Sequence, residues 1–312
     1  MNEAADNKCR VCGEEVSPKL DRVSAGTGES FEILICSACG HGRTSPQPTD
    51  LDKYYSGYYG GRHGFTARFR AMSRARILNH CFNRIAGRSV LDVGCGDGDF
   101  MLAARGSGWV VVGTERSEQI GEITGLDVLP DLIAVQKVFG DASFDAITCW
   151  HTLEHFDDPA APLDEIGKLI KTDGVLLIAV PNFGGWQSRF FGRHWLHLDV
   201  PRHLSHFTSD SLDQLFSKHG FKVERSWHSE FEYDVLGWSQ SGLNAIFPTP
   251  NAFFHLLSGK PTKIGSFSKI VNFALGSLFS AVSLPFVLFG SLARKGGTLV
   301  VKAVKVDNST QI

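Results

Sequence analysis

The segment that most constrains this chain runs from Val90 to Phe100, VLDVGCGDGDF, where a short apolar run ends in an acid and glycines follow at alternate positions. An apolar-periodic stretch, FMLAA, begins at its end, so the pattern predicts a strand, a tight turn and a helix. Glycines at such a turn let the backbone approach a ligand at the helix N-terminus. The segment therefore predicts an α/β fold whose ligand lies at the carboxyl end of a strand.

The acids around this turn indicate the kind of ligand. The nicotinamide fingerprint G-x-G-x-x-G needs glycine at position 99, where this chain has Asp99. Together with Asp92 and Asp97, this carboxylate would repel a pyrophosphate but could accept hydrogen bonds from an ammonium group. A second predicted strand, 110–115, ends in Glu115 about twenty residues past the loop, where a carboxylate binds ribose hydroxyls. S-adenosylmethionine has an ammonium, a ribose and no phosphate, and so fits both features.

Four segments resemble the motifs of the class I S-adenosylmethionine-dependent methyltransferases: LDVGCGDGDF, VVGTE, SFDAITCWHTLEHFDDP and DGVLLIAVPN. The resemblance covers roughly residues 88–232. It implies a Rossmann-like α/β sheet of seven strands, the last one antiparallel, with S-adenosylmethionine as the cofactor. A Rossmann-like domain with another ligand is the alternative. The residues expected to bind the cofactor are Asp92, Gly94, Cys95, Gly96, Gly98, Glu115, Arg116, Asp131, Leu132, Trp150 and His151.

The candidate catalytic residues are histidines. Methyl transfer is an in-line displacement at an activated carbon, so the protein supplies alignment and in some cases a base. His155 follows the predicted strand 144–149 at the edge where ligands bind, which makes it the first candidate base. His203 and His206 are the next candidates. The alternative is that His155 is a hydrogen-bonded residue that keeps its loop in shape.

The same motif is similar to that of the ubiquinone-pathway O-methyltransferases, whose version holds a divalent cation with two glutamates and a histidine. Glu154 and His155 match two of those positions, but His151 stands where the other glutamate would be. A hard divalent ion prefers oxygen ligands, which argues against catalytic magnesium. The pairs His194/His197 and His203/His206 have a metal-ligand spacing, although their aromatic neighbours favour hydrogen bonding.

Two C-x2-C knuckles precede this core. Cys9 and Cys12 form the first knuckle, and Cys36 and Cys39 form the second. Each knuckle is followed by a glycine, as in a four-thiolate zinc ribbon over residues 1–48. Such zinc is structural because four thiolates leave no open position. A disulfide framework and a nucleic-acid-binding ribbon are the alternatives, but the first suits oxidising compartments and the second needs a basic surface.

Residues 49–88 join the ribbon to the core. They begin with a tyrosine-rich stretch, which in similar methyltransferases helps to close the cofactor pocket; packing between ribbon and core is the alternative. From Phe65 the pattern predicts an amphipathic helix. No acid occurs between Asp52 and Asp92, whereas seven arginines do, so this helix has the character of one that lies on anionic lipid. Its predicted buried residues are Phe69, Met72, Ala75, Leu78, Phe82 and Ile85.

The predicted core, 89–242, includes an aromatic and histidine-rich loop at 183–207 that we expect to cover the substrate. The segment 243–295 is rich in uncharged residues, and its part 270–293 is long enough to span a bilayer core. Residues 296–312 contain the expected last strand, which must pair in the same sheet as the earlier strands. The apolar segment should therefore enter and leave the membrane from one face, as a hairpin. A soluble lid or a dimer contact is the alternative.

Composition bears on partners and location. A formal charge of -2 gives no reason to expect nucleic acid. No secretory signal opens the sequence, so we expect a cytoplasmic enzyme, peripheral or monotopic on the inner face of the membrane. The predicted function is O-methylation of a lipid-linked or membrane-proximal acceptor, such as a polyprenyl-linked glycan or a quinone precursor. Methylation of a nucleotide-linked sugar and an inert membrane-bound scaffold are the alternatives. The acceptor and the oligomeric state stay open.

Overall fold

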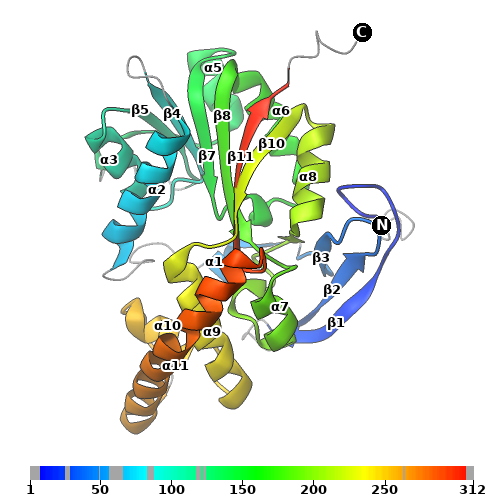
Figure 1. Ribbon diagram of the computed structural model, residues 1–312, viewed down its shortest axis with the longest axis vertical. Helices are drawn as coiled ribbons and strands as arrows, with labels where there is room; N and C mark the ends of the chain where they lie inside the picture. The colour runs from blue at the N-terminus through cyan, green and yellow to red at the C-terminus, as the bar shows by residue number, and fades with distance from the viewer. Residues whose placement is uncertain are drawn as a thin grey trace.

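The structure, a computed structural model, describes residues 8–24, 29–48, 50–55, 66–82, 88–116, 121, 124–262 and 264–306. A seven-stranded sheet forms its centre, a smaller sheet lies beside it, and a group of helices projects from one edge (Figure 1).

The central sheet has the strand order β10-β11-β8-β7-β4-β5-β6. Its strands are β4 (Ser89–Val93), β5 (Val110–Thr114), β6 (Asp127–Leu129), β7 (Phe144–Trp150), β8 (Ile170–Pro181), β10 (Phe221–Trp227) and β11 (Thr298–Lys305). Strand β11 is antiparallel to both of its neighbours, β8 and β10, whereas β4 to β8 pair in parallel. This topology confirms the predicted class I methyltransferase sheet.

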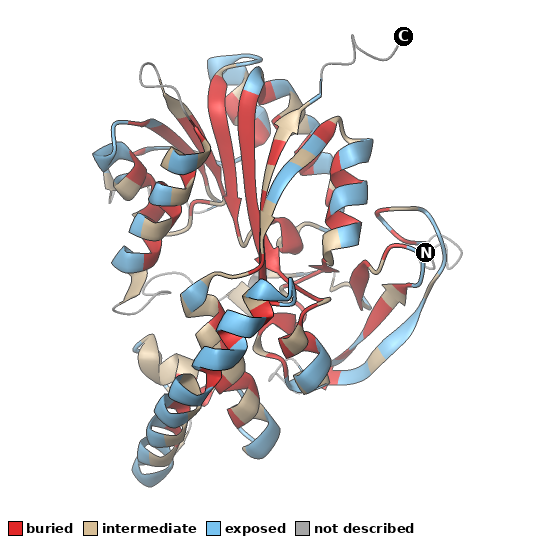
Figure 2. Cartoon of the chain, in the orientation of Figure 1, coloured by how far each residue is buried: buried red, intermediate tan, exposed pale blue. Residues whose placement is uncertain are grey.

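Helices cover both faces of the sheet, which is why β7 and the second half of β8 are buried along their whole length (Figure 2). One face packs against α2 (Ala67–Cys81) and α3 (Asp99–Gly106). The other face packs against α5 (Leu132–Phe139), α6 (Ala160–Leu169) and α8 (Ser209–Lys218).

Helix α2 buries only part of the predicted face: Ala75, Leu78 and Phe82 are buried as predicted, and Ile85 lies outside the described residues. Phe69 and Met72 are 56% and 42% exposed, whereas Arg70 and Arg74 are buried. Their guanidinium groups form buried ion pairs with glutamates near the start of α9 (Phe231–Ile246). The prediction that Phe69 and Met72 are buried is therefore wrong, because ion pairing and not apolar periodicity orients the helix. These two arginines also cannot contact a lipid surface while so paired.

The smaller sheet joins the cysteine knuckles to the core. Its order is β1-β2-β3-β9, and its strands are β1 (Val16–Ser24), β2 (Ser30–Cys36), β3 (Gly42–Ser45) and β9 (Ser205–His206). Strand β9 comes from the predicted substrate loop, so the ribbon and that loop share one sheet. The same loop contains α7 (Trp186–Phe191) and two 3-10 turns, η3 (Gly192–His194) and η4 (Leu196–Leu198).

Helices precede the last strand, as predicted, but the described residues form three of them and not a simple hairpin: α9, α10 (Ala252–Leu257) and α11 (Ser266–Leu292). We call them the C-terminal helical module. It begins at Phe231, earlier than the expected start at residue 243. Helices α9 and α11 lie so close that a Cβ on Gly242 would be 2.9 Å from the Phe279 ring. Because α9 follows β10 and α11 precedes β11, the module leaves and rejoins the sheet at one edge (Figure 1).

Candidate active site

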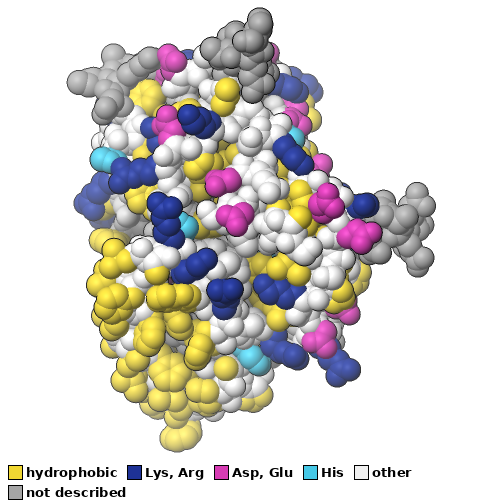
Figure 3. Space-filling view, turned by 45° about the vertical axis from the view of Figure 1, so that its right-hand side comes forward, with side chains coloured by type: hydrophobic (Ala, Val, Ile, Leu, Met, Phe, Trp, Pro, Cys, Tyr) yellow, Lys and Arg dark blue, Asp and Glu magenta, His cyan; other side chains and the backbone are white. Residues whose placement is uncertain are grey.

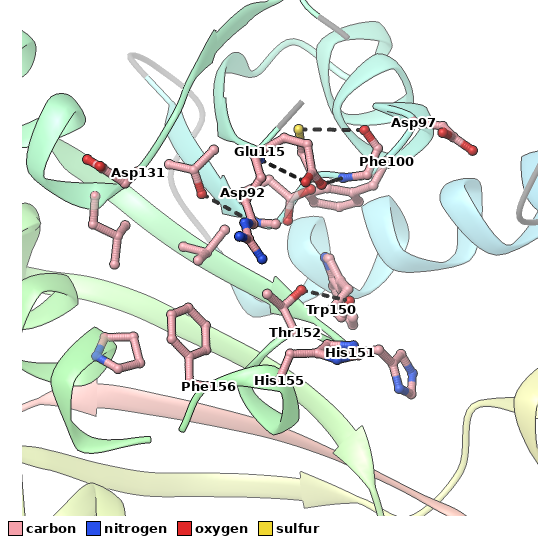
Figure 4. A pocket seen from close by; sticks show the side chains of 18 of the residues that line it. Asp92, Asp97, Phe100, Glu115, Asp131, Trp150, His151, Thr152, His155 and Phe156 are labelled. Atoms are coloured by element: carbon pink, nitrogen blue, oxygen red, sulfur yellow. Dashed lines mark hydrogen bonds between the residues drawn. The ribbon is translucent and has the colours of Figure 1, made fainter. Parts of the chain in front are cut away.

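A cavity of about 580 Å³ lies at the carboxyl ends of β4, β5 and β7, the edge at which α/β sheets bind ligands (Figure 4). Every residue predicted to bind the cofactor lines this cavity except Gly98. Gly98 instead has a φ of 77° and is the N-cap of α3, so it shapes the turn.

The glycine loop is held against the second acidic strand end. Gly94 has a φ of 71°, and a Cβ there would lie 2.4 Å from Thr152 Cγ2, so no larger residue fits. The amide of Gly96 donates to Glu115 Oε2 at 2.9 Å. The two motifs that the sequence separates by about twenty residues are thus in direct contact around one cavity.

Asp92 is the most buried acid of this cavity. Its Oδ1 accepts a 2.6 Å hydrogen bond from the Thr148 hydroxyl. Burial raises the pKa of Asp92 to about 7, although this hydrogen bond and the charge of Arg74 act in the opposite direction. An ammonium group would give the carboxylate a closer positive partner. The residues therefore fit S-adenosylmethionine, whose sulfonium carries the methyl group to be transferred.

Asp131 and Leu132 lie at the far end of the cavity. The Asp131 side chain caps α5 by accepting a 2.7 Å hydrogen bond from the amide of Ala134. This cap positions the start of α5 beside the loop that we expect to contact adenine.

A second cavity of about 770 Å³ adjoins the first. Four residues line both cavities: Arg70, His151, His155 and Tyr233. A group bound in the second cavity can therefore meet a cofactor in the first. Sequence reasoning found His151 and His155 but missed Arg70 and Tyr233, since neither belongs to a methyltransferase motif.

His155 lies at this junction, in the turn η2 (Leu153–His155). Its Nδ1 is 2.9 Å from the carbonyl oxygen of Arg202, which can only accept, so Nδ1 carries the proton and Nε2 a lone pair. Burial, together with the charge of His203, lowers the pKa of His155 to about 4. The ring is therefore neutral at pH 7, as a proton acceptor must be, although its proton affinity is reduced.

Glu154 and His203 complete a cluster with His155. Ligand atoms of the three residues lie within 4.8 Å of one another. The His203 Nδ1 lies 2.9 Å from the carbonyl oxygen of His197, so Nδ1 donates this hydrogen bond, and its Nε2 lies 3.9 Å from Glu154 Oε1. Glu154 is 1% exposed, and neither carboxylate oxygen has a hydrogen-bond partner among the described residues. The cluster could therefore hold a cation as well as a proton.

His151 forms a buried ionic bridge beside the cluster. Its Nε2 lies 2.6 Å from Glu230, and its Nδ1 lies 3.6 Å from Glu154. Its ring stacks on Tyr233 at a centroid distance of 4.0 Å. Burial lowers the pKa of His151, but these neighbours outweigh it and raise the pKa to about 10. His151 is thus a cation, and Glu230 is shared with Arg74, whose Nε donates to it at 2.7 Å.

His206, the third candidate base, lies away from both cavities in the described chain. Its Nε2 is 2.9 Å from the Thr44 hydroxyl of β3, and its ring packs on Phe183. Its place in β9 ties it to the ribbon, so its assignment as a base is corrected here. The same Thr44 hydroxyl donates to the carbonyl oxygen of His203 at 2.7 Å, which fixes the backbone of the second candidate.

The tyrosine-rich stretch serves both of its expected roles in its described part. Tyr55 lines the first cavity, and its hydroxyl is 3.0 Å from His155 Nδ1. Tyr54 packs edge-on against Phe31 of β2 and donates to Glu29. Tyr58 and Tyr59 lie outside the described residues.

The four ribbon cysteines converge near the N-terminus. Cys9 Sγ is 3.5 Å from Cys39 Sγ, and Cys12 Sγ is 3.3 Å from Cys36 Sγ. Tetrahedral zinc with Zn–S bonds of 2.3 Å needs sulfurs about 3.8 Å apart, so a small expansion admits the ion. The amide of Val11 also points at Cys9 Sγ, at 3.4 Å. The cluster could hold zinc, as its spacing predicted.

The seven-stranded sheet, the glycine loop and the acidic strand ends around one cavity define a class I S-adenosylmethionine-dependent methyltransferase. Sequence comparison agrees: the profile of a family described as methyltransferase domain matches residues 66–226, slightly more than half of the chain. The chain belongs to this family and is an S-adenosylmethionine-dependent methyltransferase.

Two curated relatives are both named ubiquinone biosynthesis O-methyltransferase. The chain is 30% identical over 159 residues to the protein of Xylella fastidiosa strain M23, covering 43% of this chain and 59% of that one. It is 32% identical over 113 residues to the protein of Actinobacillus pleuropneumoniae, covering 32% and 48%. The chain thus spans about half the length of these relatives.

Among solved structures, a Haemonchus contortus Phospholethanolamine N-methyltransferase 2 in complex with S-adenosylhomocysteine is similar in fold. The TM-score is 0.51 at 17% identity, and the match covers 85% of this chain and 62% of that one. This likeness concerns the fold alone.

Proposed function

We propose that this enzyme transfers the methyl group of S-adenosylmethionine to an oxygen atom of a lipid-linked or membrane-proximal acceptor, such as a polyprenyl-linked glycan or a quinone precursor. The observation that carries the proposal is the second cavity, which meets the cofactor cavity at His151 and His155 and extends into an apolar helical module. The names of the curated relatives, which are O-methyltransferases, also support it.

In this proposal Asp92 binds the cofactor ammonium and Glu115 its ribose, while Asp131 and Leu132 lie at the adenine. His155 Nε2 accepts the proton of the acceptor hydroxyl, and the nearby Glu154 carboxylate stabilises the resulting imidazolium. His203 lies within 4.8 Å of the same atoms and can take part in the proton transfer. The cationic His151 holds Glu154 and Glu230 in place.

We also propose that the helical module attaches the enzyme to the inner face of a membrane. Helix α11 is long and apolar enough to cross a bilayer by length and composition, and 22% of its most apolar window is buried. Hydrophobic side chains gather over the end of the molecule formed by the module, as Figure 3 shows. Because the module rejoins β11 at the edge it left, we expect attachment from one side.

The test of the acceptor class uses radiolabelled S-adenosylmethionine with two substrate pools, membrane lipid extract and soluble nucleotide-linked sugars. We expect label in the lipid fraction. Label in the sugars would replace this proposal with the nucleotide-sugar reading, and cofactor binding without transfer to either pool would favour an inert scaffold.

The ribbon and the attachment have separate tests. Metal analysis of reduced protein should find about one structural zinc per chain, and Cys36→Ser should remove it. For the attachment, the full chain should sediment with anionic vesicles and stay bound at high salt, because apolar burial is not screened as surface charge is. A chain that stays in solution with vesicles would make the module a lid.

A further inference from the structure

The second cavity has two chemically different ends. One end holds the cluster of Glu154, His155 and His203 at the sheet edge. The other lies among the three helices of the module, where most of the lining is apolar side chains from α9 and α10: Val235, Leu236, Phe253, Phe254 and Leu257. Polar residues of the module also line the cavity: Asn251, His255, Ser258, Lys260, Ser277 and Ser280. Its volume of about 770 Å³ lies within the range of small-molecule pockets.

We infer that the apolar end, which we call the chain slot, binds a single hydrocarbon chain of the methyl acceptor. The inference rests on the proposed function and deepens it, because it assigns the acceptor to amphipathic lipids with one long chain. The polar head of such a lipid would lie at Glu154 and His155, beside the cofactor cavity, while the chain displaces water from the slot.

The slot also reaches the apolar surface of the module. Ser277 of α11 lines the cavity and is exposed. Phe69 of α2 and Phe231 of α9 also line the cavity and are 56% and 57% exposed. A chain can therefore pass from a lipid layer around the module into the slot along apolar side chains.

The depth of the slot depends on one close contact between α10 and α11. Phe253 lines the cavity and is 3% exposed. A Cβ on Gly276 would lie 2.5 Å from the Phe253 ring, so the ring occupies space that a larger residue at 276 would take. Gly276→Ala should move this ring and shorten the slot, and Ser280→Leu should narrow it from the neighbouring turn of α11.

The experiment titrates linear alcohols, from hexanol to hexadecanol, into the full chain saturated with S-adenosylhomocysteine, with binding measured by calorimetry. Affinity should rise about fourfold for each methylene, which corresponds to ~0.8 kcal/mol, until the slot is full. Gly276→Ala and Ser280→Leu should each weaken binding of the longest bound alcohols by about tenfold and leave hexanol unchanged. A parallel series of isoprenoid alcohols distinguishes a straight from a branched chain.

Two control variants separate the slot from the outer surface. Gly265 is the N-cap of α11, and a Cβ added there would have no atom within 4 Å. Gly265→Ala should therefore bind the alcohols as the unmodified chain does. Leu288→Ser removes a side chain that is 58% exposed on α11 and does not line the cavity. It should weaken vesicle binding but keep the alcohol series unchanged. Calorimetry with S-adenosylhomocysteine shows whether each variant is folded. If Gly276→Ala is unfolded, Ser280→Leu alone tests the slot.

Affinity that does not grow with chain length would overturn the inference, as would equal losses in Leu288→Ser and Gly276→Ala, which would place the chains on the outer face. The proposed function fails separately. If alcohols fill the slot but no lipid is methylated, the slot remains and the proposed acceptor is wrong. If lipids are methylated with no dependence on chain length, the reaction remains and the slot is wrong.

Discussion

The two cavities that meet at His151 and His155 are built in different ways. The cofactor cavity is formed mainly by the ends of neighbouring parallel strands and by the loops that directly follow them. The second cavity draws its walls from α2, the 183–207 loop and all three helices of the C-terminal module, which are far apart in the sequence. The residues expected to bind the cofactor therefore belong to short local motifs, whereas the proposed acceptor site depends on how distant segments pack.

This difference predicts that changes on the two sides have separable effects. Substitutions among the strand-end residues should alter cofactor affinity, and substitutions in the second cavity should alter turnover. Glu230 forms ion pairs with Arg74 and His151 between the two cavities, so its loss should lower the stability of the fold.

The largest expected effect is that of His155→Ala on turnover. Loss of a general base lowers the rate by about 10²- to 10⁴-fold. Methyl transfer to the lipid extract should fall by this factor in single-turnover assays, while S-adenosylhomocysteine affinity by calorimetry changes little. If instead cofactor affinity falls and the rate at saturation is kept, His155 is a structural residue of its loop.

Glu230→Gln should cause the second-largest change, in stability. The substitution removes the ion-pair partner of the buried Arg74, which should lower the free energy of unfolding by about 3 kcal/mol. Urea denaturation followed by circular dichroism should show a lower midpoint. The control is Glu165→Gln, whose partner Lys168 is exposed at the surface, and its midpoint should move little. Equal midpoints for the two variants would mean that the bridge does not stabilise the fold.

Asp92→Ala and Glu115→Ala test the cofactor side. Each removes a charge-assisted hydrogen bond worth roughly 1.5 to 3 kcal/mol, so each should weaken cofactor binding by about ten- to a hundredfold. Calorimetry with S-adenosylmethionine measures both. Leu236→Ala, in the second cavity, is the matched control and should leave this affinity unchanged. Normal binding by both acidic variants would refute their assignment.

The smallest expected effect is a pH dependence of cofactor affinity. In the free protein the pKa of Asp92 is raised to about 7, so below this pH the carboxyl group is protonated and cannot pair with an ammonium. Binding must then release a proton, and affinity should fall about tenfold for each pH unit below that pKa. Calorimetry at pH 8 and pH 6 should show weaker binding at the lower pH, and Asp92→Asn should bind more weakly but lose this dependence.

Some features of the site were predictable because they are local. Asp92, Gly94 and Gly96 belong to one turn, and Glu115 ends the next strand, so a strand-turn-helix pattern places them together. The ribbon cysteines were predictable for the same reason, since each knuckle places two thiolates a few residues apart. In both cases a short sequence pattern, the strand-turn-helix segment or the C-x2-C knuckle, places neighbouring functional side chains close together.

Other features were not predictable from periodicity or motifs. The arginines of α2 give the sequence the pattern of a basic surface helix. In the structure Arg70 and Arg74 are buried, because they form ion pairs with Glu232 and Glu230. The prediction for His206 failed in a similar way, because pairing of β9 with β3 carries it toward the ribbon. Each outcome depends on a partner more than a hundred residues away in the sequence.

The sequence by itself determined the sheet, the cofactor loop and the cysteine cluster, because hydrophobic alternation, glycine turns and short ligand spacings act over a few residues. Tertiary structure decided which histidines reach the junction, that His151 is held as a cation between two carboxylates, and that an apolar slot opens among α9, α10 and α11. These properties depend on burial and on charges brought close by folding, and burial strengthens electrostatic interactions that would be weak in water.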